Sequence, residues 1–360
     1  MVVKSYIYSL LLALFLPFAA SAEGAAHAEH GAEDAGKSPS EIVVEKIMHH
    51  IADANEFHIA TVGGEHISFP LPCILYSKTT GKISFMMSSQ FHHEEVIDGY
   101  RMDHGKIVDA ATGERNTFID FSITKNVFQM LLGVVILALI MFSVKSAYAK
   151  RGNKAPKGLQ SWIEPIVSFL ADDVIKPNVG PKYEKFLPFL LSIFFFILIN
   201  NLLGLVPFFP GSANVSGNIA FTFALAAITF LVINLNGNKS YWGHVLAMPG
   251  VPKWVLVILT PVEIAGLFIK PIALMLRLFG NITGGHIAIL SIVSLIFIFG
   301  EMGKSVGGAS LGSAMAIPIV LFVNAMELFV AFLQAYVFTL LSSIFIGAAV
   351  EEHHHSEEHH

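Results

Sequence analysis

The chain has 360 residues, of which 54% are hydrophobic and 14% charged, and its formal net charge is −5 at pH 7. Soluble domains carry about a quarter of their residues as charged side chains, so this composition excludes an ordinary soluble protein and indicates a protein embedded in a lipid bilayer. Acidic residues predominate over 23–120 and basic residues over 121–350, so two differently solvated regions share the chain. We expect no nucleic-acid partner.

Residues 1–22 read MVVKSYIYSLLLALFLPFAASA, with one lysine, an apolar core and a small-residue A-x-A ending. This pattern is typical of a secretory signal peptide, and an uncleaved anchor is the alternative. Both interpretations place the following residues outside the cytosol. Cys73 is the only cysteine, so an intrachain disulfide is excluded.

Residues 23–120 predict a small, acidic, histidine-rich exported region of α/β-like character. Period-2 patches such as KISFMMS and turn signals such as VGGEH and TTGK indicate a few short strands. Nine of the 16 histidines lie here, including His49, His50, His92 and His93. They could bind a metal or protons, but without tight ligand spacing a solvated face is the favoured interpretation, and we expect no metal site.

The membrane part, residues 121–350, is predicted to be all-α and polytopic. The first span is 126–144, because it is uncharged and, at about 1.5 Å per residue, long enough to cross a hydrocarbon core about 30 Å thick. Five basic residues between 145 and 157 follow it, and the positive-inside rule assigns them to the cytoplasm. We therefore expect a multi-pass protein of the bacterial inner membrane with a periplasmic N-terminal region and a cytoplasmic C-terminus.

The next segments are an interfacial helix and two spans. Residues 158–180 carry an apolar stripe interrupted by acidic side chains, which favours a helix on the cytoplasmic surface. Residues 186–206 and 217–235 are spans separated by a turn that contains Pro207 and Pro210.

Two longer apolar segments, 251–299 and 314–349, follow and are joined by the glycine-rich linker 301–313. At about 70 and 50 Å if fully helical, both exceed the membrane thickness, so we expect a steeply inclined hairpin. The fold class is thus about five membrane helices plus one interfacial helix, followed by a tail at 351–360 that we expect to be solvated.

Polar residues recur along this hairpin at helical spacing. Glu263, Lys270 and Arg277 are seven residues apart and share one face of the first long helix, with Asn281 close to it. His286 falls on the opposite side, about 13 Å along the axis from Arg277.

Glu327 and Gln334 share a face of the second long helix. In an antiparallel pair, residues at one depth have equal sums of residue numbers, and this rule matches Arg277 with Gln334 and His286 with Glu327. Structural polar pairs are one interpretation. The other is a chain of titratable groups for a proton relay, with the acid partner of Arg277 on another subunit.

The motifs LMLRLFGNITGGH, ELFVAFLQAYVFTLL and INNLLGLVPF resemble subunit a of the F-type ATP synthase, over roughly 120–350. The resemblance implies a proton-translocating subunit of the rotary motor that binds no nucleotide and needs no cofactor. Its implied partners are a ring of c subunits, each with a mid-membrane carboxylate, the b subunits of the peripheral stalk, and the remainder of the synthase.

By the same resemblance Arg277 is the stator arginine that faces each ring carboxylate. Asn281, His286, Glu327 and Gln334 would line the half-channel that opens to the outside, and Glu263 the half-channel that opens to the cytoplasm. Lys270 is given no catalytic role. The chain departs from the enterobacterial pattern because the acid and the histidine at 286 and 327 are exchanged, which keeps both groups at one level.

Three other functions are alternatives. A stand-alone channel or secondary transporter would also place ionisable groups in mid-membrane, but no inverted repeat is evident. A membrane-embedded enzyme would need a catalytic motif such as H-E-x-x-H, which does not occur. A histidine-rich metal sensor would use the exported region and the tail EEHHHSEEHH, which a solvated tail explains better.

Overall fold

The computed structural model describes residues 53–62, 65–94, 96–103, 106–151, 155–206, 209–246, 248, 250–300 and 305–351, together with residues 41, 44 and 47. The predicted signal peptide and all of the C-terminal tail except Glu351 lie outside the described residues. The chain divides into two compact units, each assembled from separate stretches of sequence. The first comprises 1–131, 203–215 and 284–327, and the second comprises 132–202, 216–283 and 328–360.

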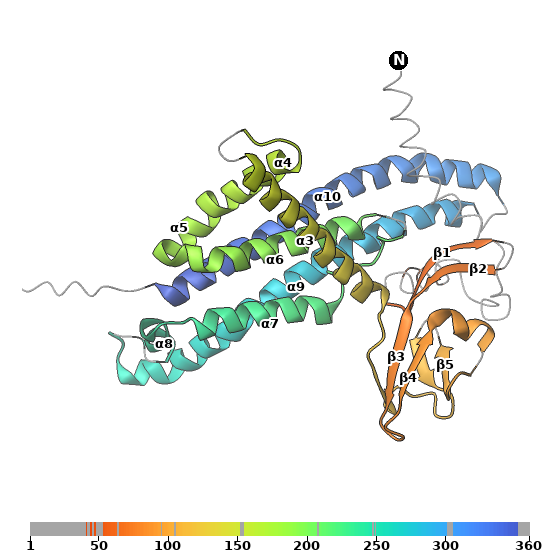
Figure 1. The fold of residues 1–360 in the computed structure, drawn as a ribbon, viewed down its shortest axis with the longest axis horizontal. Helices are drawn as coiled ribbons and strands as arrows, with labels where there is room; N and C mark the ends of the chain where they lie inside the picture. Colours follow the sequence, from red (N-terminus) through yellow and green to blue (C-terminus); the bar gives the residue numbers. More distant parts are fainter. Residues whose placement is uncertain are drawn as a thin grey trace, which may run out of the picture. The chain divides into compact units, whose positions relative to one another are not determined.

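The first unit contains the N-terminal strand region, residues 53–120 (Figure 1). Its elements are β1 (Glu56–Val62), β2 (Glu65–Pro70), β3 (Pro72–Ser77), β4 (Ile83–Met87), the 3₁₀ helix η1 (Ser88–Glu94), β5 (Tyr100–Asp103), β6 (Lys106–Asp109) and β7 (Phe118–Asp120). They form a β1–β2 pair, a sheet of order β4-β3-β7 and a β5–β6 pair, antiparallel throughout. The predicted strand in KISFMMS is confirmed as β4.

The centre of this region lies around β3, whose side chains alternate between buried and more exposed positions as period-2 patterning requires. Cys73 and Leu75 are fully buried in its small apolar core with Ile107. Described residues offer no group of metal ligands.

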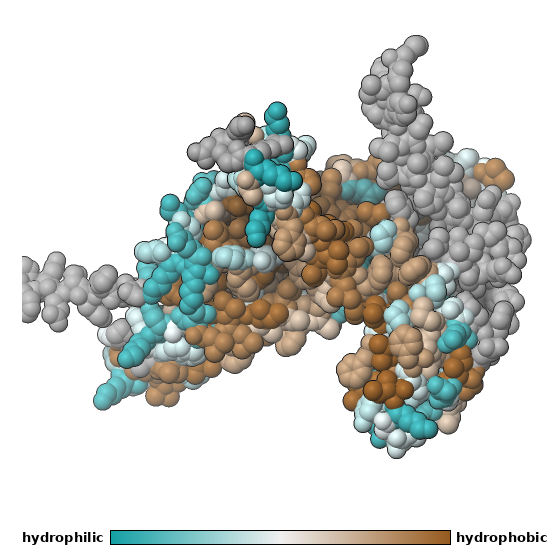
Figure 2. All heavy atoms as spheres, viewed as in Figure 1, coloured by the Kyte–Doolittle hydropathy of each residue, from teal (hydrophilic) through white to brown (hydrophobic). Residues whose placement is uncertain are grey.

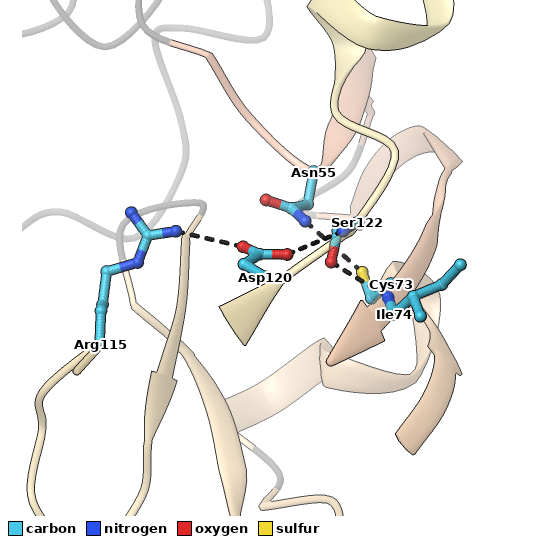
Figure 3. Close-up of polar contacts among 6 residues, drawn as sticks. All are labelled: Asn55, Cys73, Ile74, Arg115, Asp120 and Ser122. Carbon is cyan, nitrogen blue, oxygen red and sulfur yellow. Dashed lines mark hydrogen bonds and ion pairs between the residues drawn. The ribbon is translucent and has the colours of Figure 1, made fainter. Parts of the chain in front are cut away.

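A line of polar contacts ties β3 to the segment that follows β7 (Figure 3). Asn55 donates to the sulfur of Cys73 at 3.7 Å, and the backbone N–H of Ile74 donates to Ser122 Oγ at 3.1 Å. Asp120 accepts from the Ser122 N–H at 2.9 Å and forms an ion pair with Arg115 at 3.2 Å. The segment leading into the first membrane helix is therefore fixed on the strand region.

The helices are α3 (Lys125–Arg151), α4 (Leu159–Ser168), the π-helix η2 (Phe169–Ile175), α5 (Lys176–Val179), the 3₁₀ helix η3 (Gly180–Lys182), α6 (Tyr183–Gly204), α7 (Ile219–Leu235), α8 (Lys239–Leu246), α9 (Lys253–Phe299) and α10 (Val306–Val350). In the described residues four stretches are long and apolar enough to cross a membrane, or five if α7 and α8, bent by 105°, count as one span. The chain is thus a multi-pass membrane protein, as the composition predicted.

The second unit is packed around α6, whose Leu190, Phe194 and Ile197 are completely buried. The facing stretch of α10 is rich in small residues, including Ala331 and Ala335, both 0% exposed. A Cβ added at Gly347 would collide with the backbone carbonyl of Asn178. Small residues therefore let the helices approach closely, which is how membrane helices gain packing energy.

The helices of the second unit have apolar sides and polar residues at their ends. Figure 2 shows mostly hydrophobic residues over the sides of the helices and hydrophilic residues over α4, α5 and α8. The helix α8 was not predicted. It begins after Asn238, whose side-chain oxygen accepts the Tyr241 N–H at 2.7 Å and so caps the new helix.

One boundary prediction is wrong. The expected linker 301–313 is helical from Val306 onward, so α10 is longer than predicted. Ser305 caps it, because its hydroxyl oxygen accepts the N–H of Gly308 at 3.1 Å. The glycines then serve packing: a Cβ at Gly308 would collide with the carbonyl of Phe299, and one at Gly312 would lie 3.0 Å from the Cα of Ile296.

Candidate functional site

Within the first unit, Glu327 meets α9 beside His286. A Cβ added at Gly285 would overlap the carboxyl oxygen Oε1 of Glu327 and lie 3.0 Å from its carboxyl carbon. The level predicted for His286 and Glu327 therefore agrees with the register of the two helices. The missing side chain at position 285 provides the space that the Glu327 carboxyl group occupies.

The Glu327 carboxyl group is buried without a partner. Its side chain is 8% exposed, and neither carboxyl oxygen has a hydrogen bond to any described residue. Buried polar groups in native proteins are nearly always paired, and a catalytic role is one explanation for an exception. A titratable group held in this way is suited to exchanging protons with a mobile donor.

His286 is half-buried and turns its imidazole toward a glycine. Measured from the position that a Cβ would occupy on Gly204, the carbonyl oxygen of Ala213 lies at 3.2 Å, and His286 Nε2 and Gln129 Nε2 both lie at 3.9 Å. Gly204 thus leaves room for three polar groups from α3, α9 and the α6–α7 loop. The imidazole therefore has the Gln129 amide and the Ala213 carbonyl as polar neighbours.

Gln129 was not singled out from the sequence. It is completely buried, its Nε2 donates to the Ala213 carbonyl at 2.9 Å, and its Oε1 accepts the Ala213 N–H at 2.9 Å. An amide inside an otherwise apolar span was the signal that could have drawn attention to it.

In the second unit, Arg277 and Asn281 lie on the exposed side of α9, whereas Leu274 and Leu278 enter the core. The described part of the chain offers the Arg277 guanidinium neither an ion pair nor a hydrogen bond. Gln334 is buried at 5% exposure, but no hydrogen bond joins it to Arg277 among the described residues. The structure therefore leaves the arginine open toward whatever covers α9.

The other two polar residues of that face differ from Arg277. Lys270 is exposed, and its ammonium lies 5.4 Å from the centre of the Phe345 ring, so it has a cation–π partner within the chain. Glu263 is half-buried near the beginning of α9.

A second missed polar group lies around Asn201 of the motif INNLLGLVPF. Its amide donates to the Ala331 carbonyl at 3.2 Å, and its oxygen accepts the Ser216 hydroxyl at 2.5 Å. Asn201 and Ser216 are buried, so this group fastens the end of α6 to α10 and to the chain before α7.

Comparison with known proteins gives two family matches. Residues 127–347 match the family described as ATP synthase A chain. Residues 46–127 match a domain of unknown function (DUF8433).

Individual relatives agree with the first match. The chain is 45% identical to ATP synthase subunit a of Chloroherpeton thalassium over 75% of its own length and 78% of the relative's. It is 37% identical to ATP synthase subunit a 2 of Chlorobaculum tepidum, over 96% and 82% of the two chains. With ATP synthase subunit a 2 of Prosthecochloris aestuarii it shares 36% identity over 99% and 98%. The chain therefore belongs to the ATP synthase subunit a family.

Proposed function

We propose that Arg277 couples proton movement to rotation of a partner ring, and that His286 and Glu327 deliver protons to that ring from one side of the membrane. The chain is the proton-translocating membrane subunit of an F-type ATP synthase and is not itself a nucleotide-binding enzyme.

The observation that carries the proposal is the open guanidinium of Arg277. A charged side chain in mid-membrane costs about 2.5–3.5 kcal/mol on insertion scales and almost always has a partner. No acid of the described residues is paired with Arg277, whereas Lys270 on the same side of α9 has a cation–π contact with Phe345. An acid supplied by another subunit, such as the carboxylate carried by each c subunit, completes the pair.

In this mechanism a proton enters by way of His286 and Glu327 and neutralises a ring carboxylate, which can then turn toward lipid. When the carboxylate returns to Arg277, the guanidinium stabilises its ionised form, since an opposite charge within about 4–6 Å favours ionisation. The released proton leaves past Glu263. The membrane potential contributes about 2.3 kcal/mol per charge per 100 mV.

The supporting residues fit the same scheme. Asn281 lies on the exposed side of α9 with Arg277, so it would contact the passing carboxylate, whereas the buried Gln334 would line the path. The remaining partners we propose are the b subunits of the peripheral stalk.

We also propose an orientation of the chain across the membrane. We place the strand region in the periplasm and the C-terminus in the cytoplasm. The basic residues Lys145, Lys150 and Arg151 at the end of α3, together with the hydrophilic cover of α4, α5 and α8, support this placement (Figure 2).

The test is ATP-driven proton pumping by sealed vesicles that contain the complete synthase. Arg277→Ala should abolish pumping while the complex still assembles. Lys270→Ala is the matched control, because it removes an exposed cation from the same side of α9, and it should retain most of the pumping. Wild-type pumping by Arg277→Ala would contradict the proposal, and a proton leak without the other subunits would favour a stand-alone channel.

A further inference from the structure

The α6–α7 loop is fixed at one point by a buried side chain far away in sequence. Gln129 and Ala213 lie 84 positions apart and exchange two hydrogen bonds of 2.9 Å, so one side-chain amide engages both polar atoms of one residue's backbone. Both residues are 0% exposed. This pairing fixes the position and the orientation of the peptide groups at Ala213.

The peptide that is fixed in this way lies near His286, on the other side of the Gly204 Cβ position. The Ala213 carbonyl oxygen is 3.2 Å from the Cβ position of Gly204, from which His286 Nε2 is 3.9 Å. The Ala213 carbonyl accepts from Gln129 Nε2 at 2.9 Å and from the Val215 N–H at 3.0 Å. Both lone pairs of this oxygen are thus engaged, so it is not a permanent acceptor for the imidazole. His286 then keeps a ring nitrogen for exchange with a mobile proton donor.

A second contact, at Phe209, holds the same loop closer to α6. It is an aromatic cluster that we define as Phe57, Phe69, Phe128 and Phe209. The ring of Phe209, in the loop, lies 5.4 Å from Phe57 of β1, 4.6 Å from Phe69 of β2 and 5.8 Å from Phe128 of α3. Such pairs contribute about 0.5–1.5 kcal/mol each beyond the area they bury. Phe128 is next to Gln129, so both fixed points of the loop depend on the first turns of α3.

The strand region also anchors those first turns. The N–H of Lys125 donates to the carbonyl of Ala54 at 2.9 Å, and the N–H of Asn126 donates to the carboxylate of Asp53 at 3.3 Å. These are amides that an isolated helix leaves unsatisfied at its N-terminus, where a carboxylate is also favoured. Removal of Asp53 and Ala54 would free the end of α3 that carries Phe128 and Gln129.

We propose that Gln129 is a positioning residue for proton transfer at His286, and that the β1–β2 hairpin, through the aromatic cluster, holds the α6–α7 loop over that histidine. The strand region thereby sets the rate at which protons reach the membrane part. This inference rests on the proposed role of His286.

The main test is Gln129→Met, which preserves the length and volume of the side chain and removes both hydrogen bonds. Passive proton flow is measured in vesicles that hold the complete synthase, after removal of its water-soluble part, at a fixed potassium diffusion potential. Flow per assembled membrane sector should fall roughly tenfold, because even a displacement of about 1 Å can slow a reaction by up to about a hundredfold. Deuterium oxide should slow the variant more than the wild type, which a purely structural defect would not cause.

A second variant covers the case in which Gln129→Met does not assemble. Phe69→Ala removes a ring that is 39% exposed, so it weakens the aromatic cluster without emptying a buried site, and flow should fall about threefold. Phe142→Ala is the matched control, because that ring lies on α3 with 67% exposure, and its flow should equal that of the wild type.

A labelling experiment follows the loop directly. Val215 is 2% exposed, so a cysteine introduced there should react slowly with a membrane-impermeant maleimide. Reaction should become at least about fivefold faster when Val215→Cys is combined with Phe69→Ala. Wild-type flow per sector in Gln129→Met or in Phe69→Ala would overturn the inference, as would unchanged labelling. None of these results would alter the Arg277 test, which decides the proposed function separately.

Discussion

The carboxyl group of Glu327 on α10 occupies the space that the missing side chain of Gly285 leaves on α9. The carboxyl group of Glu327 lies where a side chain on residue 285 would be, and both of its oxygens are buried without hydrogen bonds to the described residues. The position of a titratable group in the membrane is thus determined by a residue that has no side chain.

Gly285→Ala should strongly reduce proton translocation, because the new methyl group must displace the Glu327 carboxyl group. Alanine is favoured over glycine in a helix by about 1 kcal/mol, so lost helicity is not the cause. Gly284→Ala is the control, since a Cβ there meets nothing within 4 Å. ATP-driven pumping per assembled complex is the measurement, and equal activity of the two variants would contradict the role of the Glu327 position.

Exchanging the two titratable groups tests whether they act together. His286→Glu and Glu327→His should each abolish most of the proton flow, and the double variant should recover part of it, because one acid and one imidazole remain at the same level. The measurement is the non-additivity of the two losses in passive proton flow. Additive losses would show that the two groups work independently.

Burial raises the pKa of the Cys73 thiol above its ordinary value, and the charges of Asp120 and Glu56 act in the same direction against hydrogen bonds from Asn55 and Ser122. Because the thiolate is the reactive form, native Cys73 should react with maleimide far more slowly than a cysteine at the exposed Thr80 position. Its rate should still be rising at a pH where labelling of Thr80→Cys has levelled off. Rapid labelling at pH 7.5 would show that the strand region opens.

Asn201→Leu should destabilise the second unit, because it leaves the carbonyl of Ala331 and the hydroxyl of Ser216 buried without this partner. Loss of such partners costs about 1–3 kcal/mol per group. The measurement is the fraction of intact synthase that survives heating in detergent. Ser192→Ala, which removes an exposed bond within a helix turn, should have little effect.

Prediction from sequence succeeded for the features that the thickness of the bilayer determines, namely the lengths of the spans and the depths of polar residues. Uncharged runs of sufficient length became α3, α6 and α7, and the matched depths of His286 and Glu327 agree with the contact at Gly285. These features depend on helix periodicity and on the length of each apolar run relative to the bilayer thickness. Both can be read from the order of residues.

Features that depend on individual contacts were missed. The glycine-rich stretch after Ser305 has the composition of a linker, yet its bare backbone packs against Phe299 and Ile296 and stays helical. The partner of Gln129 is the backbone of Ala213, and a backbone group leaves no mark in the sequence. Alternation of apolar and polar residues also did not reveal how the seven short strands of the described residues pair into three antiparallel groups.

Gly204 has only a hydrogen atom as its side chain, and this lets three parts of the chain come close together around it. A larger residue there would need the space now shared by the Ala213 carbonyl, the Gln129 amide and the His286 imidazole. Substitutions at 204 should therefore occur only together with a change at 286 or in the α6–α7 loop. A sequence survey that found position 204 varying freely beside an unchanged histidine would show that related proteins shape this passage differently.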